Sequence, residues 1–326
     1  MRDAFVERLS TMAERNHRIM LITGDLGFGV FDSYRQRFPA QFINAGVAEQ
    51  NMTGIATGLA LEGYVVYTYS IANFVFMRCL EQIRNDAAYH DCNVNVVAVG
   101  GGFSYGALGI SHHATEDLAI MRSLPGVTVV APGDDWEAAE ATAAVAETPG
   151  VSYLRLDRSA TLAPRDVDDT FQLGKARCVR QGFDVTLAAT GGILSEALAA
   201  ADGLAEHGIQ ARVLSVHTLK PFDADALVRA AQETGGVVTL EEHTVYGGLG
   251  GAAAEALLER GAQPGFFRRM GLRQGFSSIV GSQAYLRARY GIDQHAVVDQ
   301  VRELLHTRTM PVIQRARQTG RRQKAA

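Results

Sequence analysis

One carboxylate, Glu49, lies where a short apolar segment passes through a glycine turn into a helical pattern. The segment 41–43 (QFI) predicts a short buried strand, and Gly46 permits a tight turn after it. Apolar residues then recur at helical spacing, at Met52, Ile55, Ala56 and Leu59. Glu49 is therefore expected in the first helical turn, either as an acidic residue favoured there by the helix dipole or as a carboxylate aimed into a site.

The run Gly46–Met52 (GVAEQNM) closely resembles the signature of the pyrimidine-binding domain of transketolase-type thiamine diphosphate enzymes. In that family the glutamate hydrogen-bonds N1′ of the aminopyrimidine ring and favours the tautomer that activates the thiazolium carbon. The cofactor carries the chemistry and the protein tunes it. The resemblance implies thiamine diphosphate and Mg²⁺ as cofactors, and Glu49 as a catalytic and cofactor-binding residue.

Two more segments match the cofactor side of that family. Asp25 and Leu26 follow a predicted strand at 19–22 and match an Asp-Leu pair that lies near the cofactor at a subunit interface. The alternative for Asp25 is the cap of a turn. Phe74, counted back from the run Glu81–Arg84 (EQIR), matches the aromatic that stacks on the pyrimidine ring; its alternative is an ordinary core residue.

The segment around Phe74 is predicted to be helical. Asn73 is expected to cap this helix, which should run through Phe74, Arg78, Gln82 and Asn85. Arg78 completes the expected set of cofactor-binding residues. Cys79 lies in the same helical pattern and is expected to be a small core residue.

The substrate side is expected in two loops. His112 matches the histidine of a family motif that faces the substrate, which implies a polar contact to the ketol oxygens or a proton shuttle. We group the adjacent His113 with it as substrate-binding. Arg158 matches an arginine that contacts the acceptor phosphate, and a guanidinium suits phosphate well. An ordinary exposed loop arginine is the alternative.

Two positions depart from the sugar-phosphate transketolases. Leu108 stands where many of them have an aspartate that holds a donor hydroxyl, and Gly100 stands where many have a histidine near the acceptor phosphate. We therefore expect Leu108 to contact a substrate other than the usual pentose phosphates.

The elements that position these residues alternate between strand and helix along all 326 residues, a length typical of about two domains. This pattern predicts an α/β fold with mostly parallel sheets. We expect a pyrimidine-binding domain at 1–165, a linker at 166–180, a smaller transketolase C-terminal domain at 181–308 and a basic tail at 309–326. Asp134 is expected to cap a helix, and His243 is left outside the catalytic set.

Composition excludes several other classes of protein. A net charge of −4 gives no footprint for nucleic acid, and 3 scattered cysteines form neither a disulfide framework nor a zinc site. No apolar run is long enough for a membrane span, and residues 1–3 open no signal peptide, so we expect a cytoplasmic protein.

The metal motif of the family, Gly-Asp-Gly, does not occur in this sequence. We therefore expect no metal ligands here, with Mg²⁺ held mainly by a separate diphosphate-binding subunit. The sequence predicts the second subunit of a split transketolase that transfers a two-carbon ketol unit and acts only with that partner. The chain is expected to self-associate and to form a heterotetramer with the partner subunit. The alternatives are a 2-oxoacid dehydrogenase beta subunit, a deoxyxylulose-phosphate synthase-like enzyme, or a non-catalytic regulatory subunit.

Overall fold

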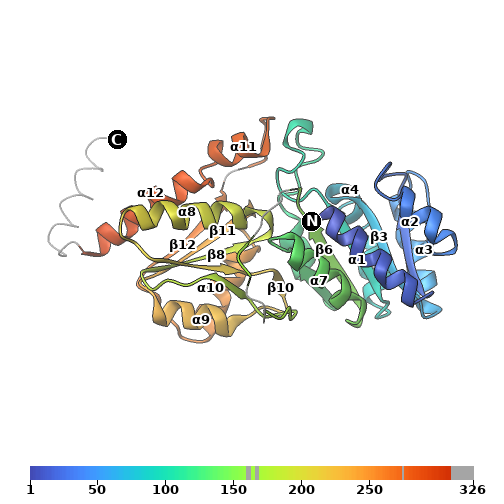
Figure 1. Ribbon diagram of the computed structural model, residues 1–326, viewed down its shortest axis with the longest axis horizontal. Coiled ribbons are helices and arrows are strands. Elements are labelled where there is room, and N and C mark those ends of the chain that lie inside the picture. The colour runs from blue at the N-terminus through green and yellow to red at the C-terminus, as the bar shows by residue number, and fades with distance from the viewer. Residues whose placement is uncertain (159–162, 166–168, 274, 310–326) are drawn as a thin grey trace.

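Two β-sheets with helices on their faces make up the molecule in a computed structural model that describes residues 1–158, 163–165, 169–273 and 275–309. Figure 1 shows the N-terminal sheet and its helices on one side and the C-terminal sheet on the other, with helix α8 (Leu194–Glu206) and helix α9 (Ala224–Glu233) on opposite faces of the latter. The expected α/β class with mostly parallel sheets is confirmed.

The first sheet has 7 strands in the order β10-β5-β6-β4-β3-β1-β2. Their bounds are β1 Ile19–Thr23, β2 Phe42–Asn44, β3 Val65–Ile71, β4 Val94–Val99, β5 Val127–Val130, β6 Val151–Leu156 and β10 Thr218–Lys220. All pair in parallel except β10, which is antiparallel to β5. Every residue of β4 and β6 is buried, as expected for strands covered by helices on both faces.

The helices of the first part are α1 Arg2–Arg15, α2 Asp32–Arg37, α3 Glu49–Leu61, α4 Ala72–Phe76, α5 Leu80–Gln82, α6 Asp117–Ser123 and α7 Asp135–Ala146. Two 3₁₀ turns, η1 Pro39–Gln41 and η3 Gly106–Leu108, and a π-helix, η2 Ile83–Ala88, complete it. The prediction that Asp134 caps a helix is confirmed, because its Oδ1 accepts from the Glu137 N–H at 2.7 Å. Cys79 is buried in the core, as predicted.

The prediction around Asn73 is wrong. Helix α4 begins at Ala72, its N-cap residue is Ile71, and no side chain caps it. The single helix expected through Arg78 and Asn85 is instead broken into α4, α5 and η2. The Asn73 amide turns away to bind a neighbouring loop, which is a competing use of a short polar side chain.

The second sheet has 5 strands in the order β12-β11-β8-β9-β7. Their bounds are β7 Arg177–Arg180, β8 Val185–Thr190, β9 Ala211–Ser215, β11 Val237–Thr244 and β12 Phe267–Leu272, and β7 alone is antiparallel, to β9. The remaining elements are η4 Gly191–Ile193, α10 Leu249–Glu259, α11 Gln283–Arg289 and α12 Gln294–Thr309. No helix within the described residues is long and apolar enough to cross a membrane.

The domain boundaries stay a prediction, and one strand crosses them. Strand β10 comes from the second half of the sequence, yet it pairs with β5 of the first sheet. Most of the predicted linker lies in described residues and includes β7, whereas nearly all of the basic tail at 309–326 lies outside them.

His217 is buried where the chain enters β10. Its carbonyl accepts from the Ala131 N–H at 2.8 Å, and its ring stacks on Phe171 with centroids 4.4 Å apart. Burial, followed by the nearby Arg177 cation, lowers the pKa of His217 to about 4, against opposition from Asp134 and other acids.

We expect stability to fall in mild acid because of this ring. In the unfolded chain the pKa of a histidine is about 6.5, so this side chain is protonated below pH 6.5. In the folded state His217 is protonated only below about pH 4, so protonation between these two pH values favours the unfolded state. The contribution of neutral His217 is thus complete above pH 6.5 and is lost as the pH falls towards 4, amounting to about 2 kcal/mol at pH 5.

Urea unfolding of the His217→Gln variant at pH 7.5 and pH 5 checks this. The variant is expected to lose about 2 kcal/mol less stability between the two pH values than the unchanged chain. The control is the exposed His207→Gln, which should leave the pH dependence unaltered. An equal loss in His217→Gln and in the unchanged chain would contradict the assignment.

Candidate active site

The Glu49 carboxylate is buried at the N-terminal end of α3, as the sequence predicts. Gly46 supplies the turn between β2 and α3 with φ of 72°, a conformation that side chains disfavour. Glu49 is only 2% exposed, and its Oε2 accepts from Arg78 Nη1 at 2.7 Å. The Arg78 side chain is 52% exposed, so the ion pair connects the buried carboxylate to a residue at the surface.

A continuous row of rings and guanidinium groups leads away from Glu49. Arg78 Cζ lies 5.5 Å from the centroid of Phe74, and the Phe74 ring meets His112 edge-on at 5.3 Å between centroids. The His112 ring then meets Tyr105 at 6.1 Å, and Arg158 Cζ lies 5.4 Å from the Tyr105 centroid. The structure thus brings five residues expected from the sequence, together with Tyr105, into one row that we call the Glu49–Arg158 row.

The loop after β1 lies against the Glu49 turn. The Asp25 N–H donates to Asn44 Oδ1 at 2.9 Å, and Asn44 Nδ2 donates back to Asp25 Oδ1 at 2.9 Å. Asn44 Oδ1 also accepts from the Gly46 N–H. A Cβ added at Gly24 would lie 3.5 Å from Glu49 Cγ, so the residue before Asp25 packs against Glu49, and Asp25 and Leu26 follow it in the same loop.

Asn73 holds the loop that carries His112. Its Nδ2 donates to the carbonyls of Ile110, Ser111 and His113 at 3.3, 3.1 and 3.0 Å. One amide thus fixes both sides of His112 against the start of α4, which carries Phe74. The sequence did not indicate this role, because an asparagine at this position is equally suited to capping a helix and to binding a neighbouring loop.

The C-terminal part anchors the same loop from its other side. The Glu242 carboxylate, at 2% exposure, accepts from the Phe103 N–H and from the side chains of Gln283 and Arg287. A Cβ added at Gly102 would come 2.4 Å from Glu242 Oε1, so the loop is packed tightly onto this carboxylate. Residues far apart in the sequence therefore share the placement of His112.

The two histidines of the loop face different surroundings. Burial, followed by the neighbouring His113, lowers the pKa of His112, and its Nδ1 lies 2.9 Å from Ser111 Oγ. The His113 ring is buried; its Nε2 lies 3.0 Å from the Gly106 carbonyl and its edge faces Phe103. The structure therefore does not bring the His113 side chain to the row, and the expected substrate contact of this residue is not supported by its position.

Leu108 and His243 lie at opposite extremes of exposure. Leu108 ends η3 with its side chain 57% exposed, on the loop that leads to His112. His243 is buried, and burial first of all lowers its pKa to about 4, although Asp117 opposes this.

Within the described residues, no group of three or more His, Cys, Asp or Glu could hold a metal ion.

Comparison with known proteins places this arrangement in one family. The model of the transketolase pyrimidine-binding domain matches residues 1–163, and that of the transketolase C-terminal domain matches residues 174–297. A 6-deoxy-6-sulfo-D-fructose transketolase subunit of Clostridium sp. (strain MSTE9) is 39% identical, over 93% of this chain and 94% of the relative. One of the subunits of the apulose-4-phosphate transketolase of Phocaeicola vulgatus is 36% identical, over 91% and 94%.

A solved structure described as a split gene transketolase, inactive beta4 tetramer, matches with a TM-score of 0.83 at 36% identity. The match covers 94% of this chain and 97% of that one. The chain therefore belongs to the transketolase family. The resemblance drawn from Gly46–Met52 is confirmed, and the chain spans nearly the full length of relatives that are themselves subunits.

We expect Asn73→Ala to loosen the His112 loop without unfolding the protein. The substitution leaves three carbonyls without their shared donor, at a net cost of about 0.5–1.5 kcal/mol, because these hydrogen bonds are exposed or only partly buried. Hydrogen exchange at residues 109–114 should become about two- to tenfold faster. The exposed Asn85→Ala is the matched control and should leave this exchange unchanged; unchanged exchange in Asn73→Ala would show that the loop is held by other contacts.

Proposed function

We propose that this chain is the pyrimidine-binding subunit of a split transketolase, which transfers a two-carbon ketol unit from a ketose-type donor to an aldehyde acceptor. The observation that carries the proposal is the buried Glu49 carboxylate at the head of a row that passes through Phe74 and His112 to Arg158. Two relatives covered over nearly their whole length are named as transketolase subunits, which supports it.

The residues present fit the aminopyrimidine end of thiamine diphosphate. The described residues form no hydrogen bond to Glu49 Oε1, so this oxygen remains for a ring nitrogen of the cofactor. The partly buried Phe74 ring supplies a flat apolar surface beside it. When bound, the cofactor supplies the carbon nucleophile that cleaves a C–C bond beside a carbonyl.

Each residue of the row has a defined task in this proposal. Glu49 holds a proton at N1′ of the pyrimidine ring, and Phe74 orients that ring by stacking. Arg78 balances the buried charge of Glu49 and keeps the carboxylate oriented. Asp25 and Leu26 line the cofactor side of the turn. His112, whose lowered pKa favours the neutral ring near pH 7, accepts or donates a hydrogen bond at the substrate oxygens.

The substrate end of the row suits an anionic sugar. Arg158 lies at the end of the row, and a guanidinium binds phosphate or sulfonate oxygens with paired hydrogen bonds. The names of both similar subunits specify a sugar with such a group, a sulfonate in one and a phosphate in the other. The exposed Leu108 offers no hydrogen bond, so we propose that the donor differs from the usual pentose phosphates.

The surface around Glu49 suits a partner subunit. Phe28 and Val47 are 78% and 73% exposed on the loops that flank the Glu49 turn. A Cβ added at Gly54 or Gly58 of α3 would meet nothing within 4 Å, so this face of the helix allows close approach. We propose that a separate subunit covers this surface, supplies the Mg²⁺ and diphosphate site, and forms a heterotetramer with two copies of each chain.

Reconstitution tests the proposed function. The purified chain with thiamine diphosphate and Mg²⁺ is expected to be inactive, and adding a separate chain that carries Gly-Asp-Gly should produce ketol transfer, measured by product mass with several ketose donors. Full activity of this chain alone would contradict the split enzyme. Release of carbon dioxide from pyruvate without ketol transfer would favour a 2-oxoacid enzyme instead.

Glu49→Gln is expected to reduce turnover of the assembled enzyme by at least about 100-fold, because a carboxamide cannot hold the proton at N1′. Thermal unfolding should show that the variant still folds. Glu62→Gln, an exposed glutamate just after the same helix, is the control and should retain normal turnover. Near-normal turnover in Glu49→Gln would remove Glu49 from the catalytic set.

Arg158→Gln is expected to raise KM for an anionic sugar substrate by roughly tenfold or more, because a hydrogen bond to a charged group is worth about 1.5–3 kcal/mol. The KM for an uncharged analogue should change little, and Arg158→Lys should recover part of the affinity for the anion. Equal changes in KM for charged and uncharged substrates would show that Arg158 does not bind the anionic group.

A further inference from the structure

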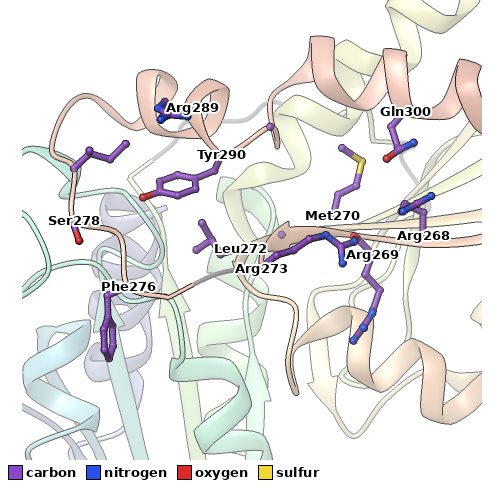
Figure 2. Close-up of a pocket in the computed structure, with 13 residues that line it drawn as sticks. Arg268, Arg269, Met270, Leu272, Arg273, Phe276, Ser278, Arg289, Tyr290 and Gln300 are labelled. Carbon is purple, nitrogen blue, oxygen red and sulfur yellow. The ribbon is translucent and has the colours of Figure 1, made fainter. Parts of the chain in front are cut away.

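A cavity of about 580 Å³ lies along the outer edge of the C-terminal sheet, apart from the Glu49–Arg158 row. Strand β12 ends the strand order of that sheet and forms one side of the cavity. The segment that follows β12 and the helices α11 and α12 form the other side, as Figure 2 shows. We call this cavity the β12 cleft.

The β12 cleft is lined by four arginines and by no acidic residue. They are Arg268, Arg269, Arg273 and Arg289. Within the part of the chain that the structure describes, none of the four forms an ion pair, and Arg268 Nε is buried without a hydrogen-bond partner. Both hydrogen bonds that these arginines donate go to backbone carbonyls: Arg269 donates to Val245, and Arg273 donates to Arg269.

Guanidinium groups that line one cavity with no carboxylate among the lining residues favour the binding of an anion there. The buried arginines Arg287 and Arg177 are by contrast paired with carboxylates, those of Glu242 and Asp134. Four guanidinium groups carry more donors than a single phosphate or carboxylate group accepts, and paired N–H groups match phosphate oxygens best.

The remaining lining residues indicate a small molecule. Tyr290 and Met270 present a ring and a thioether, and Gln300 and Ser278 add neutral polar groups. The volume lies within the range of about 300–1,000 Å³ for small-molecule sites. The Tyr290 wall also stacks on Phe103, at 5.4 Å between centroids and 17° between planes, so a ligand here would lie beside the base of the His112 loop.

We propose that the β12 cleft binds a small molecule that carries two phosphate groups or a diphosphate. The proposal does not depend on the proposed function, because it uses none of the residues of the Glu49–Arg158 row.

Calorimetric titration of the full chain with inorganic pyrophosphate at physiological ionic strength tests it, with no thiamine diphosphate present. Binding of one pyrophosphate per chain is expected. The double variant Arg273→Gln, Arg289→Gln changes two exposed side chains and should weaken binding at least tenfold. The matched control, Arg15→Gln with Arg229→Gln, removes the same charge from exposed positions outside the cleft and should bind normally.

Three outcomes would overturn the proposal. They are no binding of pyrophosphate at millimolar concentration, equal weakening in both double variants, and binding only of an acidic partner protein. A further titration with ADP and with a sugar bisphosphate then distinguishes the source of the two phosphates. Tighter binding of either one than of pyrophosphate supports the proposed site and shows whether a nucleoside or a sugar lies against Tyr290.

Discussion

Buried charges between the two sheets hold the loop that carries His112. Arg155 is buried on β6, with its Nε 3.6 Å from Asp117 and 3.4 Å from Asp157. Its Nη2 donates to the Glu242 carbonyl at 3.1 Å. Removal of one member of such a group leaves an uncompensated buried charge, which costs about 3–5 kcal/mol. A Cβ added at Gly101 would come 1.8 Å from Arg155 Nε, so the start of the loop that carries His112 is packed tightly against these charges.

These contacts join the C-terminal part of the chain to a candidate site at the N-terminal sheet. The Glu242 side chain and carbonyl connect β11 to the His112 loop and to Arg155. On the opposite side, Asn73 connects the same loop to α4 and so to Phe74. Glu49, by contrast, is placed by a strand, a glycine turn and the first turn of α3, and its carboxylate is paired with Arg78. Segments that are distant in the sequence therefore meet at the His112 loop.

Local signals in the sequence were sufficient for the core of the fold and for the head of the site. The strand predicted at 19–22 is β1, Ile19–Thr23, and Glu49 begins α3 as expected. The edge strands β7, β10 and β12 were missed, because short or charged strands lack the apolar run that marks a buried one. The roles of the site residues stay predictions.

Contacts between distant segments were beyond sequence reasoning. Nothing near Asn73 indicates that its amide reaches Ile110, and nothing near Phe103 indicates a carboxylate from β11. The burial of His113 has the same origin: adjacent side chains diverge, so only one of the pair can face the row. The arginines of the β12 cleft are spread over two segments, and only the fold gathers them.

The central claim is that Glu49 receives the aminopyrimidine ring at a site completed by a second subunit. A structure of the complex assembled from both subunits with thiamine diphosphate and Mg²⁺ tests it most directly. The account predicts a Glu49 carboxylate oxygen at about 2.7–2.9 Å from N1′, with Phe74 against the ring and the diphosphate held by the other chain. A pyrimidine ring bound away from Glu49, or a diphosphate held by this chain alone, would contradict it.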